Sequence, residues 1–431
     1  MSSRGANSDL KARVAAGLAR RYRRERLFKS AGLGALLIGL LFLAFFFVTL
    51  IGDGYTAFRQ TVIALDVELP SDAFGAGGET APEALQQANY LGMIRNALRA
   101  EFPDVSSRAE LRELFALVSA SASIDLRDRV LASPELIGQT ITIDLLADDE
   151  VDMLVKGNVD RNVPEGQRRL SDRQIAWVDA MTERGRVRQI FNKRFFTGGD
   201  SRDPEMAGIW GATVGSFYML VVTLVLSFPL GVATAIYLEE FAVRNRWTDL
   251  IEVNINNLAA VPSVIFGLLG LALFINWFGL PRSAPLVGGL VLTLMTLPVV
   301  IISARAALTS VPPSIREAAM GLGASKMQTV IHHVLPLAMP GMLTGTIIGM
   351  ARALGESAPL LMIGMVAFIV EIPGSPLDPS TALPVQVYLW ADSPERAFVE
   401  RTSAAILVLL LFLLLMNATA IFLRRHFEKR W

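Results

Sequence analysis

Two charged side chains, Arg352 and Glu356, lie in an otherwise apolar stretch of this 431-residue chain, Met339–Pro359. An arginine inside a membrane span costs about 2.5–3.5 kcal/mol, so we expect it to face a partner chain or a watery cavity. Its planar guanidinium suits phosphate oxygens. Glu356 would neutralise that charge or accept a hydrogen bond from a protonated phosphate oxygen. The alternative is a structural ion pair that locks a break at Pro359.

The helix that positions this pair carries small residues at successive i+4 positions. They are Gly341, Gly345, Gly349 and Ala353. Such a ridge lets another helix approach closely, which matters in a bilayer because lipid provides no hydrophobic drive for association. Arg352 and Glu356 lie one turn apart and about 60° around the helix from the ridge, so we expect them to flank a helix–helix contact.

A short polar segment, residues 311–336, leads into this span. Pro312 and Pro313 suit a helix start, and Glu317 follows in or near the first turn, where the helix dipole favours an anion. Pro336 is expected to open the next segment. The marked positions are Glu317, Ala318, Ala319, Gly323, Leu335 and Pro336. A short, rigid, semi-polar segment between two spans could transmit the movement of another protein to those spans. The alternative is an ordinary polar loop.

Motifs for catalysis are missing from the sequence. Gly321–Lys326 lacks the spacing of a phosphate-binding P-loop, so any ATP would be hydrolysed on another chain. There is no cysteine and there are three histidines, and neither a nucleophilic triad nor a metal-ligand pattern emerges. Forty Lys and Arg balance forty Asp and Glu, so no nucleic-acid partner is indicated. We expect neither an enzyme nor a resident cofactor.

Composition points to a polytopic membrane protein, with 52% hydrophobic residues and a mean hydropathy of +0.44. Six spans are predicted. They are Ala31–Ile51, Ile209–Leu238, Ala259–Phe278, Ala284–Ala304, Met339–Pro359 and Ser403–Leu423. The basic segments 1–30 and 424–431 place both termini in the cytoplasm by the positive-inside rule. For the first span a signal peptide is the alternative, but the apolar run is long and no clean cleavage site follows.

Between the first two spans, residues 53–205 are soluble in character and should lie outside the cytoplasm. We expect a small α+β domain with strands at Thr61–Leu69 and Thr140–Leu146 and a loop at Gly75–Gly78. Amphipathic helices are predicted at Ala84–Glu101, Arg108–Ala120 and Ser171–Phe195. Six arginines in its second half could dock a partner or attract anions; the favoured interpretation is a solvated helix face with interspersed acids. They are Arg168, Arg169, Arg173, Arg184, Arg186 and Arg188.

The Glu317-Ala318-Ala319, Gly323 and Leu335-Pro336 pattern resembles the EAA loop of bacterial ABC importer permeases, although His333 stands where that family usually has an aliphatic residue. The run from Arg352 to Pro359, with Glu356 and Ser357 inside it, resembles the PstA-type family of phosphate permeases. This resemblance covers roughly residues 210–431. PstA-type relatives commonly lack an insertion of the size of 53–205, so the resemblance assigns it no role.

The resemblance implies an all-α fold of the type I ABC importer permease kind, with the five later spans forming a permease domain over 207–423. It implies a bacterial inner-membrane complex with a PstC-like second permease, an ABC ATPase dimer that holds ATP and Mg, and a periplasmic phosphate-binding protein. The EAA residues would couple to the ATPase, helped by Arg316 and Lys326. Arg352, Glu356 and Ser357 would contact phosphate in the pathway, and Arg305 is primarily a helix-end positive charge. The alternatives are a permease for molybdate or sulfate, and a membrane sensor.

Overall fold

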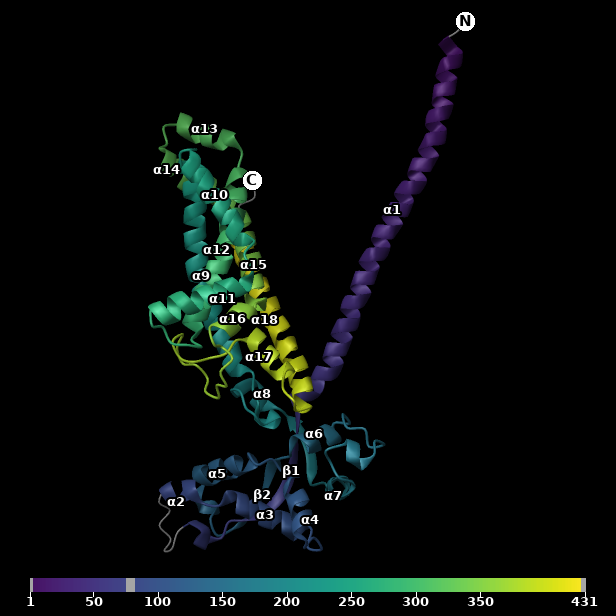
Figure 1. Ribbon diagram of the computed structural model, residues 1–431, viewed down its shortest axis with the longest axis vertical. Helices are drawn as coiled ribbons and strands as arrows, with labels where there is room; N and C mark the ends of the chain where they lie inside the picture. Colours follow the sequence, from purple (N-terminus) through teal and green to yellow (C-terminus); the bar gives the residue numbers. More distant parts are fainter. Residues whose placement is uncertain (1–2, 75–81, 428–431) are drawn as a thin grey trace. The chain divides into compact units, whose positions relative to one another are not determined.

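The computed structural model describes residues 3–74 and 82–427 (Figure 1). The predicted loop at Gly75–Gly78 and the last basic residues of the tail lie outside the described residues. Two compact units are present, residues 1–53 and 54–431. The first consists of helix α1, Ser3–Gly54, which continues without a break from the basic segment through the predicted first span. Its part from Arg20 onward is long and apolar enough to cross a membrane.

The second unit begins with the insertion domain, which we define as residues 55–206. A three-stranded antiparallel sheet of order β2-β1-β3 forms its centre. Strand β1 (Arg59–Glu68) pairs with β2 (Thr140–Leu146) through Leu65 opposite Ile143, and with β3 (Val187–Phe191) through Val62 opposite Arg188. Most of β1 is buried on both faces, because helices and the connecting loops cover it. The domain's helices are α2 (Pro82–Gln87), α3 (Tyr90–Glu101), α4 (Arg108–Phe115), α5 (Ala122–Ala132), α6 (Asp149–Val155), α7 (Asp172–Glu183) and α8 (Lys193–Thr197).

The predicted strands are confirmed, β2 over the expected residues and β1 shifted slightly toward its N-terminus. The helix predicted over Ser171–Phe195 is wrong from Arg184 to Asn192, and its last three residues belong to the short helix α8. Gly185 adopts φ +71°, which ends α7, and the chain returns as β3. The helix predicted over Ala84–Glu101 is divided, because Asn89 caps a new helix by accepting a hydrogen bond from Gly92 N at 2.9 Å. Helix α4 ends at Phe115, five residues before the predicted Ala120.

The rest of the second unit is a bundle of long apolar helices. These are α9 (Trp210–Ile236), α12 (Pro285–Thr309), α15 (Leu335–Gly355) and α18 (Ala397–Phe427). A π turn, Tyr237–Phe241, extends α9. Shorter helices complete the bundle: α10 (Arg246–Ala259), α11 (Ser263–Gly270), α13 (Pro313–Gly321), α14 (Lys326–Thr329), α16 (Ala358–Met362) and α17 (Leu383–Ala391). Figure 1 shows α13 and α14 at one end of the bundle, with α8 and α17 toward the other.

The third predicted span, Ala259–Phe278, is not a straight crossing helix. Helix α11 and the π turn that continues it reach only from Ser263 to Trp277, shorter than the about 20 residues needed to cross a bilayer. They bend by 102° from α10. Pro262 produces this break because it disfavours helical geometry in the residue before it. Among the described residues, five helices are long enough to span, and a sixth span exists if the bent pair crosses as one.

The small-residue ridge of α15 packs against α12, as the spacing predicts. A Cβ added at Gly341 would lie 2.7 Å from Ala307 Cβ, and one added at Gly345 would lie 2.1 Å from Ser303 Cβ. Neither glycine tolerates a side chain unless the helices separate. The ridge therefore fixes the distance between α12 and α15, and with it the place of whatever α15 carries.

Candidate coupling segment and anion pathway

Helix α13 contains the predicted Glu-Ala-Ala residues and exposes two of them. Its capping residue is Pro312, and Pro313 occupies the first helical position, as the two prolines predict. Glu317 lies just beyond the first turn and is exposed, as is Ala318. Ala319 is 6% exposed and turns toward the bundle. The helix therefore has one face on this chain and one that is open.

Gly323 makes the sharp turn after α13, with φ +89°, a conformation that side chains other than glycine rarely adopt. Ser325 then starts α14 with a capping box, in which Gln328 N donates to Ser325 Oγ and Ser325 N donates to Gln328 Oε1. Gly323 thus sets the direction in which the next helix leaves.

Leu335 and Pro336 do not open a new segment, which corrects the prediction. The helix is continuous from Lys326 to Gly355, with one wide π turn at Val330–Val334. Because the π turn already shifts the hydrogen-bond pattern, Pro336 follows it without breaking the helix. The coupling segment and the span with Arg352 therefore share one helix.

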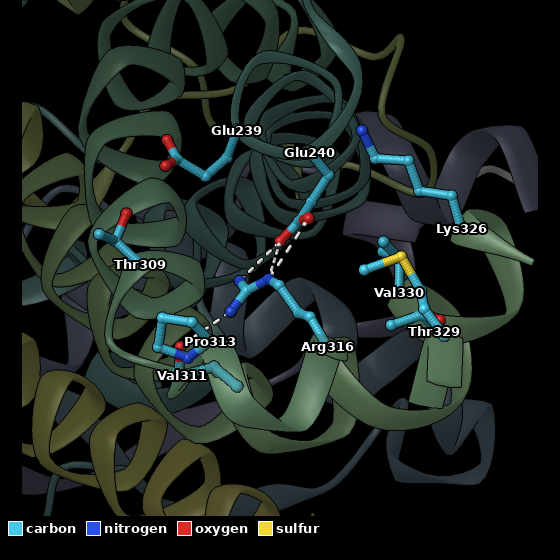
Figure 2. Close-up of a pocket in the computed structure, with 10 residues that line it drawn as sticks. Glu239, Glu240, Thr309, Val311, Pro313, Arg316, Lys326, Thr329 and Val330 are labelled. Atoms are coloured by element: carbon cyan, nitrogen blue, oxygen red, sulfur yellow. Dashed lines mark hydrogen bonds and ion pairs between the residues drawn. The ribbon is translucent and has the colours of Figure 1, made fainter. Parts of the chain in front are cut away.

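Arg316 holds α13 to the bundle, as Figure 2 shows. Its Nη2 lies 2.7 Å from Glu240 Oε1 in the π turn after α9, and it donates to Leu308 O at 2.9 Å. Its Nη1 donates to Val311 O at 2.8 Å. These contacts join α13 to the ends of α9 and α12. Arg316 is therefore engaged within this chain. This corrects the expectation that it is free to pair with the ATPase.

A cavity of about 400 Å³ lies beside this anchor. Its lining includes Glu239, Thr309, Lys326 and Thr329 (Figure 2). The Nζ of Lys326 lies 5.4 Å from the centre of the Phe241 ring, a cation–π contact. Lys326 is exposed and remains available to a partner.

Large apolar side chains on this polar segment are exposed, a feature that the sequence reasoning missed. They are Met320, Leu322, Met327 and Ile331. Leu322 is the extreme case, at 91% exposure on the turn between α13 and α14. Contiguous exposed apolar groups rimmed by polar ones mark protein–protein contacts. In the sequence, these apolar residues stand on both sides of Gly323 within an otherwise polar segment, and that pattern could have indicated the exposed surface.

Arg352 and Glu356 meet at the end of α15. Arg352 Nε lies 3.6 Å from Glu356 Oε1, and the side chains are 49% and 21% exposed. Glu356 is not on the helix, because α15 ends at Gly355 and Glu356 is extended. Ser357 precedes α16, and its carbonyl accepts the amides of Leu360 and Leu361 at 3.0 Å. The break therefore comes before Pro359, and half of the Arg352 side chain faces away from this chain.

Arg305 pairs with two acids near the α13 end of α12. Its Nη2 lies 2.9 Å from Glu252 Oε1 on α10, and its Nε lies 3.4 Å from Glu239 Oε2. Arg305 and Arg352 are not brought together by a shared contact. No group of three or more metal-ligating side chains occurs within residues 3–74 and 82–427.

A buried charge cluster joins the insertion domain to the start of α18. Lys156 Nζ lies 2.6 Å from Asp152 Oδ2 and 2.7 Å from Glu400 Oε1, and the three side chains are 1–4% exposed. Glu400 also accepts from Thr56 Oγ1 at 2.7 Å, and Asp152 from Thr61 N at 2.8 Å. Buried charges persist only when paired and hydrogen-bonded, as here. The cluster therefore fixes the domain to the last span.

Two carboxyl groups near this junction are held toward their protonated forms. Burial, followed by the charge of Asp149, raises the pKa of Asp148 to about 8. Burial likewise raises the pKa of Glu205 above its usual range, although its bond with Ser119 opposes the effect. Asp148 caps α6 by accepting a hydrogen bond from Glu150 N at 3.2 Å. The junction thus holds a proton that the unfolded chain would release at neutral pH.

The six arginines of the domain's second half are all paired with acids, but they do not form the one solvated helix face of the favoured interpretation, because Arg188 lies on strand β3. Arg173 Nη1 lies 2.8 Å from Glu110 Oε1, and Arg184 Nη1 lies 2.8 Å from Glu101 Oε1. The other pairs are Arg168 with Asp172, Arg169 with Glu150, Arg186 with Asp66, and Arg188 with Asp144. Each guanidinium has a carboxylate of the same domain.

Comparison with known families divides the chain in two. Residues 227–431 match the family described as "Binding-protein-dependent transport system inner membrane component". Residues 15–165 match a "Domain of unknown function (DUF3333)". Residues 166–226 lie between the two matches; they comprise the last part of the insertion domain and the first part of α9.

Several curated relatives are transport permeases. The chain is 36% identical over 169 residues to "Probable ABC transporter permease protein YqgI" of Bacillus subtilis, covering 39% of this chain and 57% of the relative. It is 34% identical over 220 residues to "Phosphate transport system permease protein PstA 1" of Mycobacterium tuberculosis, covering 50% of this chain and 70% of the relative. A solved structure of the MetNI methionine ABC transporter is 19% identical and covers 51% of this chain and 98% of its own, with a TM-score of 0.41.

Proposed function

Because this chain belongs to the family of binding-protein-dependent transport system inner membrane components, with PstA-type phosphate permeases among its relatives, we propose that it is a permease subunit of an ATP-driven importer of inorganic phosphate. One observation carries the substrate assignment: Arg352, half exposed on an apolar helix, has Glu356 beside it. A guanidinium in that setting binds an oxyanion through its fork. The names of the PstA relatives support phosphate as that anion.

The proposed assembly pairs this chain with a PstC-like second permease, two ATPase subunits and a periplasmic phosphate-binding protein in the bacterial inner membrane. ATP and Mg belong to the ATPase chains. Basic side chains before the first apolar run and after the last place both termini in the cytoplasm. This topology puts the coupling segment in the cytoplasm and the insertion domain in the periplasm.

Coupling proceeds from the exposed face of α13. The ATPase would contact Glu317 and the apolar side chains around Leu322, and its closure would move α13. Arg316 carries that displacement to the ends of α9 and α12. Because the helix runs unbroken from Lys326 to Gly355, the same displacement reaches Arg352 directly.

Arg352 and Glu356 would form a transient, low-affinity anion-binding site in the pathway rather than a tight one. The carboxylate offsets the guanidinium charge, so the phosphate is released again. A protonated phosphate oxygen can donate a hydrogen bond to Glu356, whereas sulfate has no such proton at neutral pH. The pair therefore favours phosphate among oxyanions of similar size.

ATP-driven uptake by the whole complex in vesicles tests this proposal. The wild-type complex should take up radiolabelled phosphate, and excess sulfate or molybdate should not compete. Glu317→Lys should abolish uptake while the complex stays assembled, because it reverses the charge on the open face of α13. Uptake of sulfate or molybdate in place of phosphate would overturn the substrate assignment and leave the permease assignment standing.

A further inference from the structure

Four arginines on the insertion domain surround one cavity. Arg95 and Arg99 project from α3, Arg108 and Arg112 from α4, and the ring of Phe115 completes the lining. The cavity measures about 440 Å³ and is open to solvent. We call this group the α3–α4 arginine site.

The four arginines of this site lack a carboxylate partner, whereas most of the domain's other arginines have one. Arg173 and Arg184 each lie 2.8 Å from a glutamate, whereas within the described part of the chain no acid forms an ion pair with the four. Both helical pairs also place like charges at i and i+4, an arrangement that destabilises a helix. Four unneutralised guanidinium groups around one cavity point to an anionic ligand.

Phe115 holds two of these guanidinium groups in position. Arg95 Cζ lies 5.3 Å and Arg99 Cζ 5.5 Å from the centre of its ring. A guanidinium resting on an aromatic face keeps its N–H groups free at the edge. Two forks held this way at the wall of the cavity match the several oxygens of a phosphate group.

We propose that the α3–α4 arginine site binds a phosphate group carried by a soluble anion, inorganic phosphate or a phosphomonoester. Figure 1 shows α3 and α4 at the end of the insertion domain remote from the membrane helices α9 and α18, which favours a soluble ligand over a lipid headgroup. The site is separate from Arg352, and its occupation does not require transport. It gives the insertion domain a ligand-binding role of its own.

Binding of radiolabelled phosphate to the full chain in nanodiscs of neutral lipid tests the proposal. Arg352→Ala serves as the background, so that the pathway pair contributes no binding. Arg99→Gln with Arg112→Gln should weaken binding by about tenfold or more, since each removes a charge-assisted contact. The matched control is Arg161→Gln with Arg188→Gln, which removes the same charge from arginines paired with Asp179 and Asp144 and should leave the affinity within about twofold.

Thermal unfolding supplies a second readout that does not depend on transport. Neutralising all four arginines should leave the apparent melting temperature unchanged or raise it, because like-charge repulsion is relieved. Phosphate should raise the melting temperature of the background protein and not that of the fourfold variant. The proposal is overturned if neither inorganic phosphate nor glycerol phosphate binds, or if the control pair weakens binding as much as the site pair does. It is also overturned if the protein binds vesicles of anionic phospholipid but neither soluble anion.

Discussion

Replacing Arg316 by methionine tests whether the anchor of α13 transmits force. The guanidinium makes an ion pair with Glu240 at 2.7 Å and donates to the carbonyls of Leu308 and Val311 at 2.9 and 2.8 Å. Methionine preserves most of the apolar stem and removes all of these contacts. Glu240, whose side chain is only 8% exposed, then keeps its charge without a partner.

The loss is worth about 2–3 kcal/mol. Removing one partner of a fully buried pair costs about 3–5 kcal/mol, and the 20% exposure of Arg316 reduces that figure because water screens the pair. An energy of 2–3 kcal/mol shifts the ratio of anchored to released α13 by about 30- to 150-fold. The released helix still meets the ATPase, but it then pulls on α12 only through the chain link Ser310–Pro312 and no longer on α9.

The assay is the ratio of phosphate transported to ATP hydrolysed by the reconstituted complex. Arg316→Met should lower this ratio at least about tenfold while ATP hydrolysis continues, and Arg316→Lys should retain part of it. Arg246→Met is the matched control, because Arg246 is exposed at the start of α10 and forms no ion pair among the described residues. An unchanged ratio in Arg316→Met would refute the transmission argument.

Three further perturbations follow from the packing and the charges. Lys156→Met should lower the free energy of unfolding by about 3–5 kcal/mol, because it leaves buried carboxylates unpaired; adding Glu400→Gln should recover part of this loss in denaturation experiments. Gly345→Ala places a methyl carbon 2.1 Å from α12 and should cost about 1–3 kcal/mol, whereas Gly349→Ala, with 3.8 Å of room, should be silent in the same melting assay. The pKa of Asp148 is about 8 in the folded protein and 3.8 in the unfolded chain, so the free energy of unfolding falls as pH rises through that interval. Asp148→Asn keeps the helix cap and should therefore raise the apparent melting temperature more at pH 8 than at pH 5; an equal effect at both pH values contradicts this.

Local patterns in the sequence predicted much of the fold. The run Thr140–Leu146 alternates and forms β2 as expected, and the ridge around Gly345 packs as its spacing predicts. The ABC permease family and the all-α fold with a small α+β insertion are likewise confirmed. The roles of Arg352 and Glu356 in a pathway stay predictions.

Features that depend on distant contacts were beyond the sequence. The local pattern around β3 predicts a helix, but the segment forms an edge strand because it pairs with β1, and that distant pairing does not show in a local pattern. The 102° bend at Pro262 was missed because an apolar run alone does not show whether two helices are collinear. Arg316 was assigned to a partner because its own partner, Glu240, lies 76 positions away along the chain.

The most direct test of the central claim is ATP-driven phosphate uptake by vesicles that contain the whole complex with Arg352→Ala. The control is Gly355→Ala, at the same helix end, where an added methyl group meets no atom within 4 Å. We predict that Arg352→Ala loses uptake while the assembled complex still hydrolyses ATP, and that Gly355→Ala keeps uptake at the wild-type rate. Wild-type uptake by Arg352→Ala would contradict the assignment of this helix to the anion pathway.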